Sequence, residues 1–133
     1  MNKTWILLLT HGEWGKALLE STSMITGEMQ AIECYPLMPL DAIKDYSERI
    51  EKRTLAQNRN AILIADLFGG TTANVAMYMA KKYGVPALSG LSMPMLVAAD
   101  MWRNQMQGEA LVKEILKTVT GNNRNLTEIV KNV

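Results

Sequence analysis

The sequence predicts a doubly wound α/β fold, in which helices cover both faces of a parallel sheet of four strands. Short apolar runs alternate along the chain with segments whose apolar residues recur at helical spacing. The run 61–65, Ala-Ile-Leu-Ile-Ala, has no polar face, as expected for a strand that is buried on both sides. These observations favour a three-layer α/β/α architecture with strand order 2-1-3-4 and right-handed crossovers.

The first half of the chain is expected to form two strands and two helices in alternation. These elements cover residues 4–10 (strand), 14–25 (helix), 31–35 (strand) and 41–57 (helix). Gly27 can end the first helix, whereas Pro36 and Pro39 are expected to end the weaker second strand. Asp41 lies near the start of the second helix, where an acidic side chain complements the helix dipole.

The second half is expected to add two strands and three helices before a short tail. These elements cover residues 61–66 (strand), 73–84 (helix), 85–91 (strand), 95–105 (helix) and 111–119 (helix). Pro94 suits the first position of its helix, and Gly108 separates the last two helices. Residues 125–133 are too few to fold alone, so we expect them to pack against the body.

Composition narrows the classes of function that the chain can serve. Its 133 residues, 48% hydrophobic and 20% charged, suit a single domain over 1–133. A formal net charge of +1 gives no footprint for nucleic acid or an anionic membrane surface. Cys34 and His11 are unique, so one chain can build neither a disulfide nor a Cys/His metal site. The sequence lacks a signal-peptide pattern and a run of about 20 apolar residues, so we expect a cytoplasmic protein.

His11 and Asp66 end the first and third predicted strands, which are neighbours in the order 2-1-3-4. Ligands of open α/β sheets bind at the carboxyl ends of the strands. A carboxylate beside one ring nitrogen of histidine fixes the tautomer and raises the basicity of the other nitrogen. We therefore predict that His11 and Asp66 form a catalytic pair. Taken singly, His11 could be an ordinary surface or packing residue and Asp66 a turn carboxylate.

A glycine-rich turn follows the third strand and leads into a helix. Its residues Gly69-Gly70-Thr71-Thr72 can point backbone N–H groups into a concavity at the positive end of that helix. Either threonine can cap the helix or donate its hydroxyl to an oxyanion. The turn lacks the lysine of a P-loop. Gly70, Thr71 and Thr72 are thus candidate phosphate-binding residues, with a plain tight turn as the alternative.

These segments resemble the enzyme IIA (EIIA) domain of mannose-family sugar phosphotransferase systems (PTS). The resemblance rests on Ile-Leu-Leu-Leu-Thr-His-Gly over 6–12 and Ala-Asp-Leu-Phe-Gly-Gly-Thr-Thr-Ala-Asn over 65–74. It extends to Gly-Leu-Ser-Met-Pro-Met-Leu over 90–96. The three segments cover both loops of the predicted site, and the chain length fits one such domain.

The resemblance implies a phosphoryl carrier that works without a metal or another cofactor. His11 would accept a phosphoryl group from the phosphocarrier HPr, through Nε2, and pass it to a IIB component for sugar uptake. Asp66 would bond the other ring nitrogen, and Thr71 would contact the phosphoryl group. The family implies a homodimer, in which a strand from 125–133 or the segment before it crosses antiparallel to the partner's sheet. Specificity resides mainly in the membrane components, so mannose, fructose, sorbose and amino sugars all fit.

The side chains of the two predicted loops also suit a phosphoryl carrier. Neither loop holds an arginine, whose bidentate grip would stabilise the phosphohistidine too well for onward transfer. The apolar side chains of Trp14, Phe68, Met93 and Met95 could shield the phosphoryl group from water and dock partners. For Trp14 and Phe68, a place in the core is an equally good interpretation.

Three rival classes fit parts of the same pattern. Thr10-His11-Gly12-Glu13 resembles the Arg-His-Gly-Glu motif of histidine phosphatases and phosphoglycerate mutases. This chain lacks both the arginine and a second histidine to protonate the leaving group, which disfavours a hydrolase. A phosphocarrier domain for a dihydroxyacetone kinase and a non-catalytic regulatory binding module on the same scaffold remain alternatives.

Overall fold

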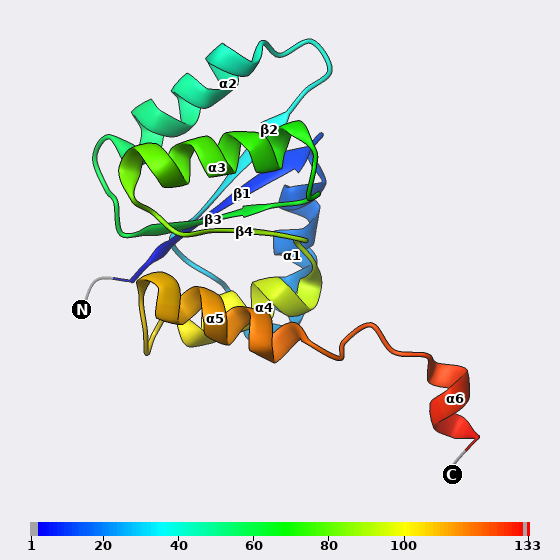
Figure 1. Ribbon diagram of the computed structural model, residues 1–133. Coiled ribbons are helices and arrows are strands. Elements are labelled where there is room, and N and C mark those ends of the chain that lie inside the picture. The colour runs from blue at the N-terminus through cyan, green and yellow to red at the C-terminus, as the bar shows by residue number, and fades with distance from the viewer. Residues whose placement is uncertain (1–2, 132) are drawn as a thin grey trace.

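Four of the predicted apolar runs form a parallel sheet between two layers of helices in the computed structural model, which describes residues 3–131 and 133 (Figure 1). The strands are β1 (Trp5–His11), β2 (Ile32–Leu37), β3 (Ala61–Ala65) and β4 (Ala87–Ser89). Their order is β2-β1-β3-β4, and every pair is parallel. The predicted fold class and strand order are therefore confirmed.

The side chains of β1 alternate between the two faces of the sheet and pack in two separate cores. Leu7 and Leu9 pack beneath α2 (Ile43–Ile50) and α3 (Thr71–Tyr83), whereas Ile6 and Leu8 pack on the opposite face. That opposite face is covered by α1 (Trp14–Thr26), α4 (Met93–Trp102) and α5 (Gly108–Val119), as Figure 1 shows. All five side chains of β3 are buried, which confirms the two-sided strand.

Parallel register brings the ends of β1 and β3 to one edge of the sheet. Leu9 pairs with Ala65, and the N–H of Asp66 donates to the carbonyl of Leu9 at 3.0 Å. On the other side of β1, His11 pairs with Leu37. The polar residues that follow β3 therefore lie beside the last residue of β1.

The second strand and second helix differ from their predicted bounds. β2 continues through Pro36 to Leu37, because β2 is an edge strand and an edge can accommodate a proline without an N–H. The second helix is α-helical only over Ile43–Ile50 and widens into a π-helical segment, η1 (Glu51–Leu55). β4 is also shorter than predicted, since it pairs only over Ala87–Ser89.

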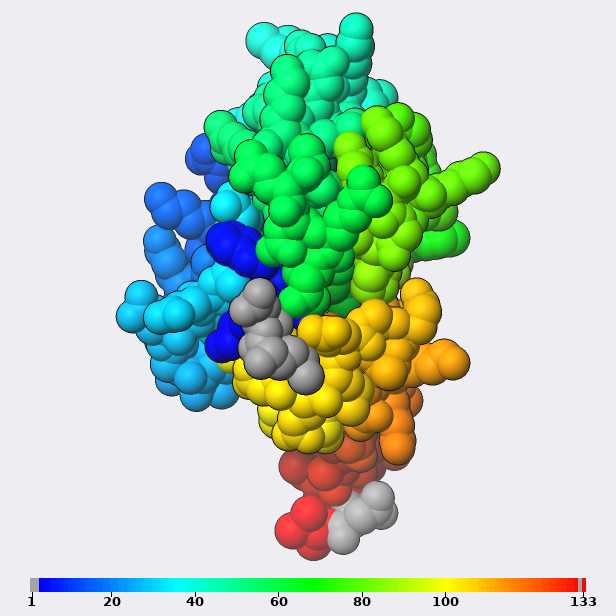
Figure 2. All heavy atoms as spheres, turned by 90° about the vertical axis from the view of Figure 1, so that its left-hand side faces the viewer, coloured from blue at the N-terminus to red at the C-terminus, as the bar shows by residue number. Residues whose placement is uncertain are grey.

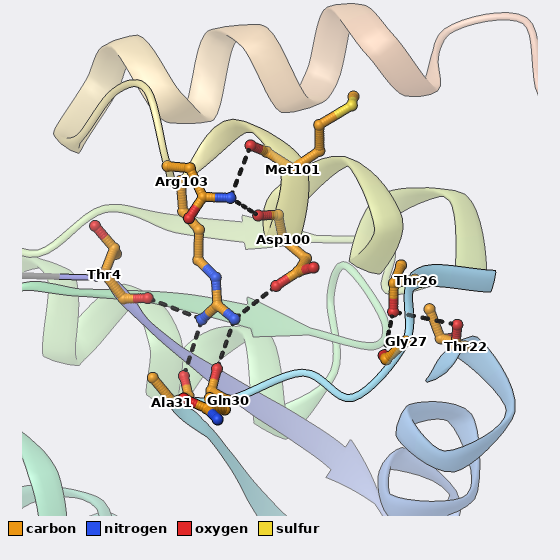
Figure 3. A network of polar contacts seen from close by, with 10 residues as sticks. Thr4, Thr22, Thr26, Gly27, Gln30, Ala31, Asp100, Met101 and Arg103 are labelled. Atoms are coloured by element: carbon orange, nitrogen blue, oxygen red, sulfur yellow. Dashed lines mark hydrogen bonds and ion pairs between the residues drawn. The ribbon is translucent and has the colours of Figure 1, made fainter. Parts of the chain in front are cut away.

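Arg103, just beyond α4, joins three distant parts of the chain at the amino-terminal side of the sheet. Its side chain is fully buried, and Figure 3 shows the guanidinium directed at backbone carbonyls and a carboxylate. It donates to the carbonyls of Thr4 (3.0 Å), Ala31 (3.1 Å) and Gln30 (2.5 Å), and to Asp100 at 2.6 Å. Arg103 thereby fixes the start of β1 against the loop that enters β2.

The tail does not pack against the body, which corrects the sequence-based expectation. Residues Leu126–Val130 form a short helix, α6, that stands away from the other elements in Figure 1. Figure 2 shows the same red segment projecting from the rest of the surface. α6 has no buried residue, and neither hydrophobic core includes one of its side chains. Within the described residues this segment supplies no fifth strand.

Candidate functional site

His11 is the last residue of β1 and lies at the surface, next to the buried Thr10. Thr10 is buried, and its hydroxyl donates to the carbonyl of Gly12 at 2.7 Å. Gly12 adopts a positive φ of 70° while its N–H donates to Leu37 of β2 at 2.8 Å. These bonds tie the turn to the sheet, and the side chain of His11 stays 46% exposed.

Asp66 is the centre of a polar cluster that confirms the predicted proximity to His11. Both carboxylate oxygens lie 3.1 Å from Nδ1 of His11, and Oδ2 also accepts the backbone N–H of His11 at 2.8 Å. Two further donors complete the cluster. They are the hydroxyl of Thr72, at 2.7 Å from Oδ1, and the indole N–H of Trp14, at 3.3 Å from Oδ2. The carboxylate is therefore held by groups from three different elements.

The hydrogen bonds keep Asp66 ionised although its side chain is only 7% exposed. Burial alone would raise the pKa of this carboxyl, but the donors from His11, Thr72 and Trp14 outweigh burial and lower the pKa below its usual value. An ionised carboxylate only accepts hydrogen bonds, so Nδ1 must carry the shared proton. In the neutral ring the lone pair then lies on Nε2.

Gly70 gives the ring of His11 its room. A Cβ atom at Gly70 would lie 3.1 Å from Cε1 and 3.6 Å from Nε2 of His11. Gly70 also precedes α3, whose first internal hydrogen bond runs from the N–H of Asn74 to the Gly70 carbonyl. The N–H groups of residues 71–73 therefore have no acceptor within the helix, and the positive end of its dipole lies beside Nε2.

The two adjacent threonines occupy different environments. Thr72 is fully buried and its hydroxyl bonds Asp66, whereas Thr71 is half-buried at the start of α3. Neither hydroxyl caps the helix, since Gly70 is the residue before it. Sequence reasoning did not identify Trp14 as a donor to Asp66. The sequence offered one indication of this bond, since Trp14 carries an indole N–H only three residues after His11.

Large apolar side chains surround the site at the surface. Trp14 is 40% and Phe68 79% exposed, so the interpretation of these two residues as core is wrong. Met95 is buried in the core beneath α4 and cannot shield the site, which corrects its expected place. Met93 is half-buried. Three other apolar side chains are exposed in the loops that follow β2 and β3, namely Met38, Leu40 and Leu67.

Among the described residues, no three His, Cys, Asp or Glu side chains gather closely enough to hold a metal ion. Cys34 is half-buried in β2, and burial raises the pKa of its thiol. No helix in the described part of the chain is both long and apolar enough to cross a membrane.

Fold and site together define an α/β protein with a carboxylate-paired histidine at the carboxyl edge of its sheet. The profile of the mannose-type EIIA family, described as the PTS system fructose IIA component, matches residues 5–116. The chain therefore belongs to this family of sugar PTS components, and the predicted family is confirmed.

Individual relatives agree with the family. The sorbose-specific EIIA component of Lacticaseibacillus casei is 27% identical over 114 residues, which cover 84% of this chain and 83% of that protein. The fructose-specific EIIA component of Bacillus subtilis is 25% identical over 113 residues, 83% of this chain and 77% of that protein.

Solved structures agree with the fold. The EIIA component from Streptococcus agalactiae matches with a TM-score of 0.85 at 20% identity, over 93% of this chain and 98% of that one. The mannose/sorbose-specific IIA subunit from Enterococcus faecalis gives 0.82 at 22% identity, over 93% and 95% of the two chains.

Proposed function

We propose that this protein is a phosphoryl carrier between HPr and a IIB component of a sugar PTS, with His11 as the phosphorylated residue. The observation that carries the proposal is the bond between Nδ1 of His11 and Asp66, which leaves the Nε2 lone pair at an exposed edge. Nε2 attacks the phosphorus of the donor phosphohistidine. The new Nε2–P bond forms as the donor's N–P bond breaks, and the leaving nitrogen keeps the electron pair.

Charge stabilisation by Asp66 supports this chemistry. When Nε2 bonds to phosphorus, the ring becomes cationic because Nδ1 keeps its proton. The ionised carboxylate 3.1 Å away offsets that positive charge without moving. We assign the phosphoryl oxygens to the N–H groups that open α3 and to the hydroxyl of Thr71, the first residue of that helix.

The modest strength of this phosphate cradle suits onward transfer. Within the described residues, the hydrogen-bond and ion-pair partners of His11 and Asp66 include no lysine or arginine. A bidentate arginine would stabilise the phosphohistidine and slow its release. The acceptor nucleophile of the IIB component can then attack the phosphorus, and the Nε2–P bond breaks with its electron pair returning to Nε2.

The apolar rim around the site supports a protein as donor and acceptor. We define the rim as Trp14, Met38, Leu40, Leu67 and Phe68, all exposed at the carboxyl edge of the sheet. Exposed apolar patches of this kind mark interaction sites. A groove of about 570 Å³ between α2 and α3 meets this edge at Thr71. A protein that exchanges phosphoryl groups with HPr and a IIB component must share their compartment, and we propose that this compartment is the cytoplasm.

We also propose a homodimer in which the tail contacts a second copy. The apolar side chains of Leu126, Ile129 and Val130 are exposed on α6, which stands clear of its own body. Light scattering tests the proposal on the full chain and on a chain shortened after Thr120. The expected result is a dimer that becomes a folded monomer on truncation, and a monomeric full chain would contradict it.

The carrier function is tested by incubation with phosphoenolpyruvate, enzyme I and HPr, followed by mass spectrometry of the intact protein. We expect the mass to rise by one phosphoryl group, in a bond that is stable to alkali and labile to acid. His11→Ala should abolish the gain. A wild-type protein that stays unmodified, or a gain that survives His11→Ala, would contradict the proposal.

A further inference from the structure

We propose that Thr72 is a positioning residue for phosphotransfer, whose hydroxyl holds Asp66 in the orientation that keeps a proton on Nδ1 of His11. The inference rests on the proposed function and assigns a separate task to each of two adjacent threonines. Thr72 acts on the imidazole through Asp66, whereas Thr71 keeps the phosphate-binding role that the proposed function gives it.

The position of Thr72 in α3 makes its hydroxyl informative. The residues of α3 that are buried against the sheet are Thr72, Ala73, Val75, Ala76 and Met79. The other four are apolar, as a core-facing position favours. A fully buried hydroxyl there requires a partner, and Asp66 supplies it at 2.7 Å.

Counting protons separates the two threonines. A hydroxyl has one proton to donate, and both an ionised carboxylate and a phosphoryl oxygen can only accept. The proton of Thr72 is directed to Asp66, so Thr72 cannot also donate to a phosphoryl group while that bond lasts. This leaves Thr71 and the N–H groups of 71–73 for the phosphoryl oxygens.

The bond fixes Oδ1, the carboxylate oxygen that has fewer partners. Oδ2 accepts the backbone N–H of His11 and the indole of Trp14, besides its contact with Nδ1. Among the described residues, the partners of Oδ1 are Nδ1 of His11 and the Thr72 hydroxyl. Without that hydroxyl, Oδ1 keeps only its contact with Nδ1, so the carboxylate is held less firmly about its Cβ–Cγ bond and the preference of the ring for the Nδ1–H tautomer weakens.

The test compares Thr72→Val, which removes the hydroxyl at nearly constant shape, with Thr72→Ser, which keeps the hydroxyl. Thr22→Val is the matched control, because Thr22 on α1 is equally buried and its hydroxyl bonds the Leu18 carbonyl at the same 2.7 Å. Two readouts are measured for each protein. They are the imidazole ¹⁵N resonances, which report the tautomer, and the single-turnover rate of phosphoryl transfer from phospho-HPr.

We expect Thr72→Val to give mixed tautomers and a transfer rate that falls by up to roughly tenfold. Hydrogen bonds to charged groups contribute more free energy than those between neutral groups. Thr72→Ser and Thr22→Val should keep the wild-type tautomer and a rate close to that of the wild type. An unchanged tautomer and rate in Thr72→Val would overturn the proposal. So would a Thr72→Ser protein as slow as Thr72→Val, because methyl packing would then be the cause.

If Thr72→Val does not fold, Thr72→Ala takes its place against Thr72→Ser with the same expectations. A wild-type protein that accepts no phosphoryl group would refute the proposed function. In that case the tautomer comparison alone decides the positioning role, since it needs no phosphotransfer.

Discussion

Asp66 holds His11 twice, by accepting its backbone N–H at 2.8 Å and by contacting its ring Nδ1 at 3.1 Å. The two residues are 55 positions apart, so the folded sheet alone brings them together. The same carboxylate thus fixes the main chain and the side chain of one residue. Its loss should therefore affect both chemistry and stability.

Asp66→Asn should keep the fold and slow phosphotransfer by about a hundredfold or more, because a neutral amide cannot stabilise a cationic ring. The rate of transfer from phospho-HPr measures the loss, and circular dichroism checks the fold. Glu109→Gln, which neutralises a carboxylate on the distant helix α5, should transfer at the wild-type rate. Equal rates for Asp66→Asn and wild type would remove Asp66 from the mechanism.

Asp66 should also make stability depend on pH in the acid range. Its pKa is lowered in the folded state, so the unfolded chain binds more protons and stability rises with pH. The contribution is complete above about pH 4, the ordinary pKa of aspartate, and disappears as the pH falls through the lowered folded pKa. Urea unfolding at neutral pH and near pH 3 should show wild type losing its advantage over Asp66→Asn. A constant difference would contradict this assignment.

Gly70→Ala should disturb the ring rather than the backbone. Gly70 has φ −90° and ψ 172°, which any residue adopts, but its Cβ would lie 3.1 Å from Cε1 of His11. We expect transfer to fall roughly tenfold through misplacement of the ring, with little loss of stability. Gly69→Ala should do the reverse, since its φ is +87° and its Cβ would meet no atom within 4 Å. Transfer rates and melting temperatures of both variants distinguish the two effects.

Arg103→Met should be strongly destabilising. It removes the Arg103 donor from the carbonyls of Thr4 and Gln30 and from the carboxylate of Asp100, at a cost of about 3 kcal/mol or more, whereas the Ala31 carbonyl keeps the N–H of Ile6. Arg49→Met removes a partly exposed ion pair with Asp41 and should cost less than about 1 kcal/mol. Urea unfolding gives both values. Similar losses for the two variants would deny Arg103 its anchoring role.

The sequence was sufficient to predict the sheet order and the meeting of His11 with Asp66. Alternating apolar runs define the strands, and parallel strands bring their carboxyl ends to one edge. The roles of Thr71 and Thr72 depended on a finer feature. The helix was expected from Ala73 but begins at Thr71. One residue turns a helix by about 100°, so the start decides which hydroxyl points inward.

Long-range contacts account for most of what the sequence did not indicate. Arg103 bonds the carbonyl of Thr4 across 99 positions, and no local pattern marks an arginine as buried. Pro36 remains in β2 because that strand lies at the edge, which is a property of the assembled sheet. Residues 125–133 were expected to pack against the body because they are too few to fold alone, yet α6 has no buried residue.

The ring nitrogen that carries the phosphoryl group shows whether Asp66 directs the chemistry of His11. Because Asp66 engages Nδ1, we expect phosphorus to bond to Nε2 of His11. NMR of the ¹⁵N-labelled phosphoprotein resolves the two nitrogens by their coupling to phosphorus. Coupling at Nε2, with a protonated Nδ1, is the expected result. Coupling at Nδ1 would contradict the role assigned to Asp66, because that nitrogen could not then donate to the carboxylate.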